Sequence, residues 1–307
     1  MAEPDLTSDD RACAAAIRAG SRSFHAASLL LPRTVRRDAL ALYAFCRMSD
    51  DLVDAPDGAG SAADRLSVRL DAIYGGRPHA HYADRAFARV VREHAIPKAV
   101  PDALIEGFRW DEAGGAYATI DELNGYGARV ASTVGVMMTL IMGRREPALL
   151  ARACDLGLAM QLTNIARDVG EDARNGRVYL PIDWLSEAGA DPRQLHADPA
   201  PSPAVRAVTA RLLSEADRLY DRARTGIGGL PRGCRPAIGA ALGIYREIGR
   251  VVAANGHDSV TRRARTTGWR KLDLAARSMR HLVDGGTVDA APTEPAARFL
   301  VDAVRGD

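Results

Sequence analysis

The apolar residues of this chain recur mainly at helical spacing, and this periodicity limits the fold more than any other feature of the sequence. Helix starts are often marked by Pro, Ser or Asp and helix ends by Gly, as at Pro32, Gly143 and Pro147. No stretch shows the regular alternation of a series of strands. The sequence therefore predicts an all-α protein, with helices over residues 8–19, 33–54, 62–74, 81–94, 102–112, 121–142, 147–172, 181–188, 203–225, 236–254, 271–282 and 293–304.

The predicted helices are expected to form one domain. The chain has 307 residues, of which 47% are hydrophobic and 26% charged, as in globular proteins. The Gly-, Pro- and Asp-rich loops at 55–62, 189–203 and 285–295 are short, and there is no internal repeat at a fixed period. We expect a single domain over residues 1–307, a helical bundle with a central apolar cavity, in which residues 1–9 and 285–307 are peripheral or flexible.

Charge and cysteine content exclude several classes of protein. Basic and acidic residues nearly cancel (41 against 39), which argues against a nucleic-acid partner. The N-terminal ten residues are acidic and lack the apolar region of a signal peptide. The most hydrophobic stretch, 130–143, is shorter than the roughly 20 residues that span a bilayer. We expect a cytoplasmic protein with isolated thiols and no disulfide or zinc site at its four cysteines, Cys13, Cys46, Cys154 and Cys234.

The predicted helix 33–54 ends in an acidic stripe. At about 100° per residue, one narrow stripe contains Tyr43, Arg47, Asp50 and Asp54, with Asp51 at its margin. The other sides of the helix are apolar. This helix therefore presents an arginine and at least two carboxylates in one direction.

The predicted helix 147–172 carries a second stripe. Gln161, Asn164, Asp168 and Asp172 follow one another at i, i+3, i+7 and i+11. Like charges at i,i+4 destabilise a helix by about 0.2–0.5 kcal/mol, but a hard divalent cation, which prefers oxygen ligands, reverses the sign of that effect. Either stripe alone is also compatible with a solvated acidic face. Together they predict an oxygen-lined mouth that binds a metal–diphosphate cluster.

Several segments resemble the squalene/phytoene synthase family. The resemblance spans about residues 10–280. The segments SFHAASLLLP, ALYAFCR and QLTNIARDVGEDAR are most similar to those of the bacterial phytoene synthases. The chain departs from the family at Gly20, where many relatives have histidine, and at His257, where an aromatic residue is usual. The matching motifs are GSRSF (20–24), DDLVD (50–54), YGARVASTVG (126–135), QLTNIARDVGED (161–172) and RVYLP (177–181).

The resemblance implies a bundle of the isoprenoid synthase type that condenses two prenyl diphosphates head to head. For the phytoene synthase branch it implies that two geranylgeranyl diphosphates form phytoene through prephytoene diphosphate, with release of diphosphate, in carotenoid biosynthesis. The reaction requires Mg²⁺ or Mn²⁺, and no NADPH is expected.

Carried over by position, the resemblance also implies roles for individual residues. The expected metal ligands are Asp50, Asp54, Asn164, Asp168 and Asp172. The expected substrate-binding residues are Ser21, Arg22, Tyr43, Arg47, Gln161, Asn164, Tyr245 and Arg263. Catalytic roles are expected for the four stripe aspartates and for Tyr126.

This chemistry fits the residues themselves. Carboxylates repel a diphosphate, so metal ions must stand between them as Lewis acids, while an arginine fork matches phosphate oxygens. Because water destroys a carbocation, the space beyond the mouth is expected to be dry. Its candidate lining is 130–140, where Ala131, Ser132 and Gly135 leave room for a long prenyl chain, although ordinary helix packing explains small residues equally well. Tyr126 and Tyr179 are candidates for stabilising cations.

Other activities remain as alternatives. The nearest is squalene, dehydrosqualene or presqualene diphosphate synthesis from farnesyl diphosphate in the same fold. A head-to-tail prenyltransferase or terpene cyclase fits the second motif poorly, and a non-catalytic assembly factor should have lost its aspartates. Because the expected product is a hydrocarbon, we expect peripheral association with the inner face of the membrane and contact with other carotenoid enzymes.

Overall fold

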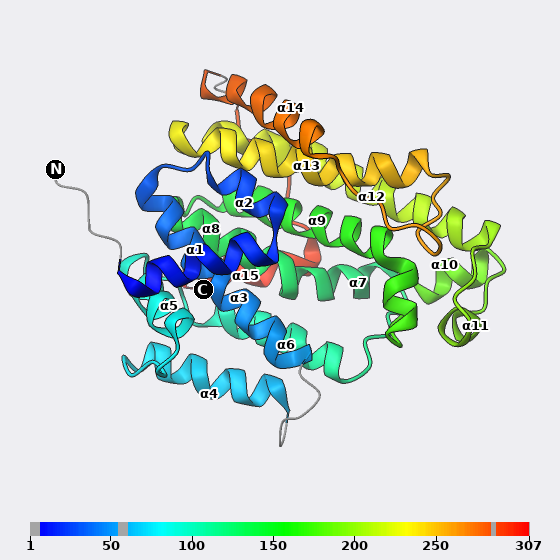
Figure 1. Ribbon diagram of the computed structural model, residues 1–307, viewed down its shortest axis with the longest axis horizontal. Coiled ribbons are helices and arrows are strands. Elements are labelled where there is room, and N and C mark those ends of the chain that lie inside the picture. Colours follow the sequence, from blue (N-terminus) through cyan, green and yellow to red (C-terminus); the bar gives the residue numbers. More distant parts are fainter. Residues whose placement is uncertain (1–6, 55–60, 284–286, 307) are drawn as a thin grey trace.

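The computed structural model describes residues 7–54, 61–283 and 287–306, apart from the side chains of Arg22 and Asp54 (Figure 1). Within these ranges the chain is helical and contains no strand, which confirms the predicted all-α class. The elements are α1 (Ser8–Gly20), α2 (Arg22–Ser28), α3 (Arg33–Asp54), α4 (Ala62–Tyr74), α5 (Tyr82–Glu93), α6 (Ala99–Glu112), α7 (Ile120–Gly127), η1 (Ala128–Ser132), α8 (Thr133–Ile141), α9 (Pro147–Arg174), α10 (Ile182–Glu187), α11 (Pro192–Ala197), α12 (Pro203–Gly226), η2 (Ile227–Gly229), η3 (Arg232–Cys234), α13 (Arg235–Ala254), α14 (Gly268–Ser278), η4 (Met279–Leu282), η5 (Pro295–Ala297) and α15 (Arg298–Arg305).

Helix starts follow the capping chemistry that the sequence predicts. At α1, Thr7 Oγ1 accepts from the Asp10 N–H at 3.2 Å, and the Asp10 carboxylate accepts from the Thr7 N–H at 3.1 Å. Ser202 caps α12 through Val205 N–H, and a proline follows it in the first turn. Such caps give acceptors to the N–H groups that have no partner inside the helix.

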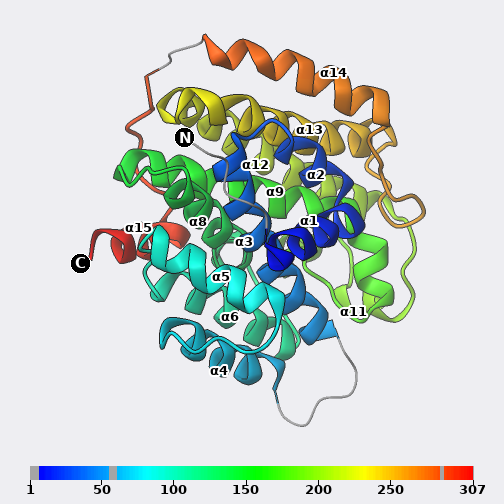
Figure 2. The same ribbon diagram turned by 60° about the vertical axis from the view of Figure 1, so that its left-hand side comes forward.

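Helix α9 runs through the middle of the bundle, with α12, α13, α8 and η1 packed around it (Figures 1 and 2). It has 28 residues and is buried along much of its length by residues such as Leu158, Leu162 and Ile165. None of the helices among the described residues has both the length and the hydropathy that crossing a bilayer requires.

The predicted single helix over 121–142 is wrong in detail, because a π-helical turn, η1, separates α7 from α8. The backbone of this segment lies against that of α9. A Cβ on Gly157 would lie 2.7 Å from the backbone of Ala131, and one on Gly135 would lie 2.6 Å from the Ala153 oxygen. Ser132 Oγ donates to the Cys154 carbonyl at 2.8 Å. The wider turn re-aims neighbouring side chains, as π-bulges near functional sites often do.

Two short helices, α2 and α11, are not anticipated by the sequence. Helix α2 has seven residues and α11 has six, so neither contains enough turns to show an apolar period. Both depend on a side-chain cap, from Ser21 and Asp191 respectively. Their existence is decided by a cap and by packing, which a periodicity search does not detect.

The C-terminal region, expected at the periphery, packs into the bundle where it is described. Leu300 and Val301 of α15 are buried. Residues 288–294, here called the C-terminal strap, cross α9 and α12. The guanidinium of Arg152, which is only 1% exposed, donates to the carbonyls of Asp289 (3.2 Å) and Ala291 (3.1 Å). The strap therefore forms part of the wall of the bundle.

Candidate active site

A cavity of about 510 Å³ lies at the centre of the bundle, lined by residues of α2, α3, α6, η1, α8, α9 and α13. Its α9 wall extends from Leu149 to Asn164, which corresponds to roughly 22 Å at about 1.5 Å per residue. Towards Leu149 the lining is mostly apolar and includes Leu31, Met142 and Leu230, beside the buried Arg152. Towards Asn164 it is polar. The predicted central apolar cavity is therefore present, and one end of it carries the candidate chemistry.

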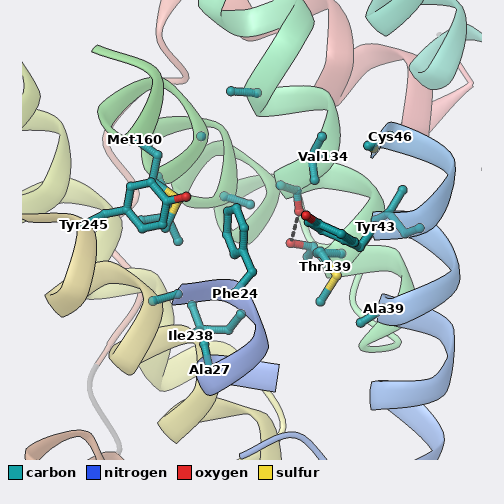
Figure 3. A pocket seen from close by; sticks show the side chains of 18 of the residues that line it. Phe24, Ala27, Ala39, Tyr43, Cys46, Val134, Thr139, Met160, Ile238 and Tyr245 are labelled. Atoms are coloured by element: carbon teal, nitrogen blue, oxygen red, sulfur yellow. Dashed lines mark hydrogen bonds between the residues drawn. The ribbon is translucent and has the colours of Figure 1, made fainter. Parts of the chain in front are cut away.

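Aromatic side chains from three helices meet inside the cavity. Figure 3 shows the Phe24 ring of α2 between Tyr43 of α3 and Tyr245 of α13. The ring centroids lie 6.3 Å (Phe24–Tyr43) and 5.2 Å (Phe24–Tyr245) apart. Burial raises the pKa of both tyrosines, so their hydroxyls stay neutral. Two predicted substrate-binding residues are thus brought together, with Phe24 as a third member that the sequence does not single out.

The first acidic stripe reaches the polar end of the cavity. Asp50 and Arg47 both line the cavity and are exposed to solvent. Arg47 Nη2 lies 2.6 Å from Asp51 Oδ1, so the residue at the margin of the stripe pairs with its arginine. The predicted metal ligand Asp54 has its side chain outside the described part of the chain.

The second stripe divides between the cavity and the surface beyond it. Gln161 and Asn164 line the cavity, whereas neither Asp168 nor Asp172 is among its lining residues. Asp168 is held by two arginines: Arg167 Nε lies 2.7 Å and Arg263 Nε 2.8 Å from its Oδ1. Arg167 belongs to the matched motif, but its contact with the predicted metal ligand is not visible in the sequence.

Arg263 reaches α9 because Gly170 has no side chain. A Cβ at Gly170 would lie 2.4 Å from the Val260 oxygen, and the Gly170 N–H donates to the Ser259 carbonyl at 3.0 Å. The loop thus lies directly on the helix, where Arg263 contacts Asp168 and also Glu171 at 2.8 Å. The predicted phosphate-binding arginine therefore lies at the second stripe.

Asp172 lies in surroundings that favour its neutral form. Burial, together with the charges of Asp168 and Glu171, raises the pKa of Asp172 to about 7. A carboxyl group perturbed in this way by burial and by like charges is a candidate functional group.

The described side chains of Asp50 on α3 and of Asp168 and Asp172 on α9 come from different helices, and they form no group of three at metal-binding separation. In the part of the chain that is described, the one cluster of three acidic or histidine side chains at metal-binding separation is Asp38, Glu93 and His94. Asp38 already accepts hydrogen bonds from Arg37 at 3.0 Å and from Arg89 and pairs with His94 at 2.9 Å. That cluster is an ion-pair network between α3 and α5.

Asp111 is another site residue that sequence reasoning misses. It lines the cavity, and its carboxylate accepts from the hydroxyls of Tyr126 and Tyr179, both at 2.8 Å. Those two rings stack with a centroid separation of 5.4 Å, and Tyr117 stacks on Tyr126 at 5.2 Å. Burial and Asp111 raise the pKa of Tyr126 well above its ordinary value. A single acidic residue near the end of α6 gives no periodic signal.

The predicted substrate-binding residues near the N-terminus are Ser21 and Arg22, and the structure describes the side chain of the first. Ser21 lines the cavity and caps α2, and its Oγ accepts from the Phe24 N–H at 3.2 Å. The side chain of Arg22 is outside the described residues. Ser21 therefore places both a hydroxyl and the start of a short helix at the cavity.

The family model of the squalene/phytoene synthases matches residues 17–270 of the chain. The chain belongs to this family. It is 52% identical to a protein of Rhodobacter capsulatus named phytoene synthase, over 99% of this chain and 91% of that one. It is 38% identical to the 15-cis-phytoene synthase of Pantoea ananas, over 83% of this chain and 86% of that one. The predicted family membership is confirmed.

Solved structures agree with this assignment. A dehydrosqualene synthase in complex with a ligand superposes with a TM-score of 0.82 at 29% identity, covering 89% of this chain and 96% of that one. The squalene synthase HpnC of Alicyclobacillus acidocaldarius gives a TM-score of 0.71 at 26% identity, covering 81% and 94%. As a member of this family the chain is a prenyltransferase with the isoprenoid synthase fold.

Proposed function

We propose that this enzyme is a phytoene synthase, which joins two molecules of geranylgeranyl diphosphate head to head, through prephytoene diphosphate, and releases diphosphate. One observation carries the proposal: a single cavity joins a mouth of carboxylates, amides and arginines to a long apolar interior. The relatives with this name cover nearly the whole chain and support it.

The length of the cavity supports a C20 substrate. A geranylgeranyl chain has about fifteen successive main-chain carbon–carbon bonds of roughly 1.5 Å, so its extended zigzag is just under about 20 Å long. A farnesyl chain, with about eleven such bonds, extends to under about 15 Å. The α9 wall of roughly 22 Å accommodates the longer chain from the mouth to the apolar end.

The oxygen donors at the mouth and on the α9 surface beyond it fit Mg²⁺ or Mn²⁺. Asp50, Asn164, Asp168 and Asp172 offer the hard oxygen atoms that these ions prefer, with Asp54 as a further ligand by position. Burial and the charges of Asp168 and Glu171 raise the pKa of Asp172, and a bound cation would favour its charged form. When bound, the ion neutralises diphosphate charge as a Lewis acid.

Arginines complete the diphosphate site. Arg47 lines the cavity beside Asp50, while Arg167 and Arg263 converge on Asp168. Their planar forks match phosphate oxygens and bind them in fixed orientation. These side chains hold the leaving group at the mouth and thereby direct the prenyl chain into the apolar interior.

The interior protects the cationic intermediates. Its apolar walls exclude water, which would otherwise capture a carbocation. Tyr126 lies at the cavity with its hydroxyl hydrogen-bonded to Asp111, and the negative face of an aromatic ring attracts a nearby cation. We propose that Tyr126 stabilises positive charge while Asp111 and Tyr179 fix its orientation.

Product identification tests the proposal. The purified enzyme is incubated with Mg²⁺ and either geranylgeranyl or farnesyl diphosphate, with and without NADPH, and the extracted hydrocarbon is identified. We expect phytoene from the C20 substrate, with no need for NADPH. Efficient formation of squalene or dehydrosqualene, with no C40 product, would contradict the proposal and favour the farnesyl alternative.

The proposal extends to the place of action. Phytoene is insoluble in water, so we propose that the enzyme works in the cytoplasm at the inner face of the membrane, beside other carotenoid enzymes and without a nucleic-acid partner. All four cysteines in the described part of the chain are free thiols, as in a reducing compartment.

A further inference from the structure

The face of α14 that packs on α13 combines an ion pair with close contacts to two glycines. Arg270 Nε lies 2.8 Å from Glu247 Oε1. A Cβ on Gly243 would lie 3.7 Å from Leu274, and a Cβ on Gly239 would lie 3.5 Å from Ser278. At about 100° per residue, Arg270, Leu274 and Ser278 share one side of the helix.

The opposite side of α14 is apolar and faces outward. On α14, Trp269 is 84% exposed and Leu272 62%, and Ala276 is also exposed; beyond the helix, Met279 at the start of η4 is 44% exposed and Val283 after η4 is 85% exposed. These five residues are here called the apolar stripe, and the three on α14 lie roughly 180° from its packed face. Figures 1 and 2 both show α14 as an outermost helix, lying on α13. A surface helix of a globular protein normally has the reverse arrangement, with its apolar face towards the core.

The surroundings of the apolar stripe are basic. Arg262, Arg265, Arg277 and Arg280 are all exposed. The acidic residue of α14, Asp273, is paired with Arg270 and Arg277. Pairing of two copies through this surface would bring like-charged arginines together, which disfavours a second copy as the partner. An anionic surface complements the same residues.

We propose that the apolar stripe binds the surface of an anionic lipid bilayer. A helix with Trp and Leu on one side and Arg or Lys around it lies in the interface plane with its apolar side about 5–10 Å into the headgroup boundary. Basic residues near the surface strengthen binding to anionic membranes, and Trp favours this depth. All five residues of the stripe except Trp269 lie beyond residue 270, outside the segment that matches the family.

The stripe lies close to the cavity in the fold. Helix α14 contacts α13 and α2, which also supply Ile238, Tyr245 and Phe24 to the cavity wall. Leu29, the residue that follows α2, is 56% exposed. A bilayer bound to the stripe therefore lies beside the helices that enclose the prenyl chains. The benefit for a hydrocarbon product rests on the proposed function, whereas the binding itself does not.

Vesicle co-sedimentation of the full chain, without substrate, tests the proposal. Vesicles of phosphatidylcholine alone are compared with vesicles that contain about 30% phosphatidylglycerol, a composition that gives a strong negative surface charge. We expect binding to the anionic vesicles that weakens as salt is raised. The double variant Trp269→Ser, Leu272→Ser should bind at least about 10-fold more weakly, since about 1.4 kcal/mol is tenfold and two large apolar side chains contribute more than that.

A matched control and a charge variant make the test specific. Val68→Ser alters a residue that is 60% exposed on α4, away from α14 (Figure 1), and should bind like the wild type. The double variant Arg265→Glu, Arg280→Glu should lose the preference for anionic vesicles. Circular dichroism and thermal unfolding confirm that each variant is folded.

Three results would overturn the proposal. They are wild-type binding by the stripe variant, an equal loss in Val68→Ser, or a wild-type dimer in sedimentation velocity that only the stripe variant dissociates. Phytoene formation in detergent is measured in parallel. Loss of vesicle binding with activity retained in detergent separates this proposal from the proposed function, because failure of the latter removes activity in the wild type as well.

Discussion

Asp50 and Asp168 belong to acidic stripes of similar appearance, but the structure gives them different surroundings. Asp50 is exposed at the cavity mouth, and its neighbour Arg47 pairs with Asp51 in solvent, where both side chains are about half exposed. The side chain of Asp168 is only 14% exposed, with Arg167 and Arg263 bound to it. Exposed ion pairs contribute about 0–1 kcal/mol, whereas hydrogen-bonded charges shielded from water interact more strongly.

This difference indicates a division of work between the two helices. The α9 site has its counter-charges in place and its geometry fixed by the loop that lies on Gly170. The Asp50 side chain on α3 is exposed, so ions from solution can reach its carboxylate. We infer that α9 orients the diphosphate through arginines that are already positioned, while α3 completes the site when metal and substrate arrive.

The largest expected effect comes from neutralising one carboxylate on each helix. Asp50→Asn and Asp168→Asn should each lower kcat at least about 10³-fold, because metal-based charge stabilisation contributes several kcal/mol. Helical content should stay at the wild-type level. Asp51→Asn is the matched control, since Asp51 pairs with Arg47 instead of facing the cavity, and should lose no more than about 10-fold. Full activity in both Asp50→Asn and Asp168→Asn would contradict a metal-binding role for these two carboxylates.

Chelation tests whether both helices depend on the same ion. EDTA should reduce phytoene formation to background, and excess Mg²⁺ or Mn²⁺ should restore it, because carboxylates alone repel the diphosphate. Asp50→Glu should raise the Mg²⁺ concentration needed for half-maximal activity, measured by titration of the dialysed enzyme. Activity that is indifferent to EDTA would contradict the metal requirement.

The arginines sharpen the comparison further. Arg263→Lys replaces a fork that makes two contacts with Asp168, at 2.8 and 3.2 Å, by a single ammonium group. We expect KM to rise roughly 10- to 100-fold, a loss of about 1.4–2.7 kcal/mol. Arg47→Lys, at the exposed site, should change KM less. Equal effects in steady-state kinetics would indicate that the two arginines are equivalent.

The smallest effect concerns stability. The pKa of Asp172, about 7 in the folded chain, lies above its ordinary value near 4. Folding therefore favours the protonated form, and the metal-free protein loses stability as pH rises from about 4 to 7. Asp172→Asn should raise the melting temperature at pH 8 by a few degrees and leave it nearly unchanged at pH 4, as measured by thermal unfolding in EDTA. Asp183→Asn, on α10, serves as the control. A lower melting temperature at pH 8 would contradict this prediction.

The sequence predicts the fold best where helices are long and capped. The bounds 33–54 and 62–74 agree with α3 and α4, and the long helix starting at Pro147 is two residues longer than predicted. The π-helical turn is missed because it results from close backbone contact with α9 at Gly157, a residue far away in the chain. Helix α2 is missed because one cap and seven residues carry no period.

The same limit applies to the site. The spacing within each stripe predicts which carboxylates face one direction, because helical geometry alone fixes it. Contacts between helices have no such signature: Asp111 meets Tyr126 and Tyr179, and Arg263 meets Asp168, only after the bundle has formed. Whether Asp172 is charged depends on burial, which spacing does not report.

The C-terminal strap has a practical consequence for anyone who shortens or fuses this chain. A truncation after residue 270, where the family match ends, would delete the carbonyl groups that receive the Arg152 guanidinium. It would also remove the Pro292 carbonyl, which accepts a hydrogen bond from Arg222, the partner of Asp155. Arg152 lines the cavity where the end of the prenyl chain is expected, so its buried charge would lose two hydrogen-bond acceptors at that point. Fusion tags are therefore better placed after Arg305. Variants that change the preferred length of the substrate can be sought first among the strap residues.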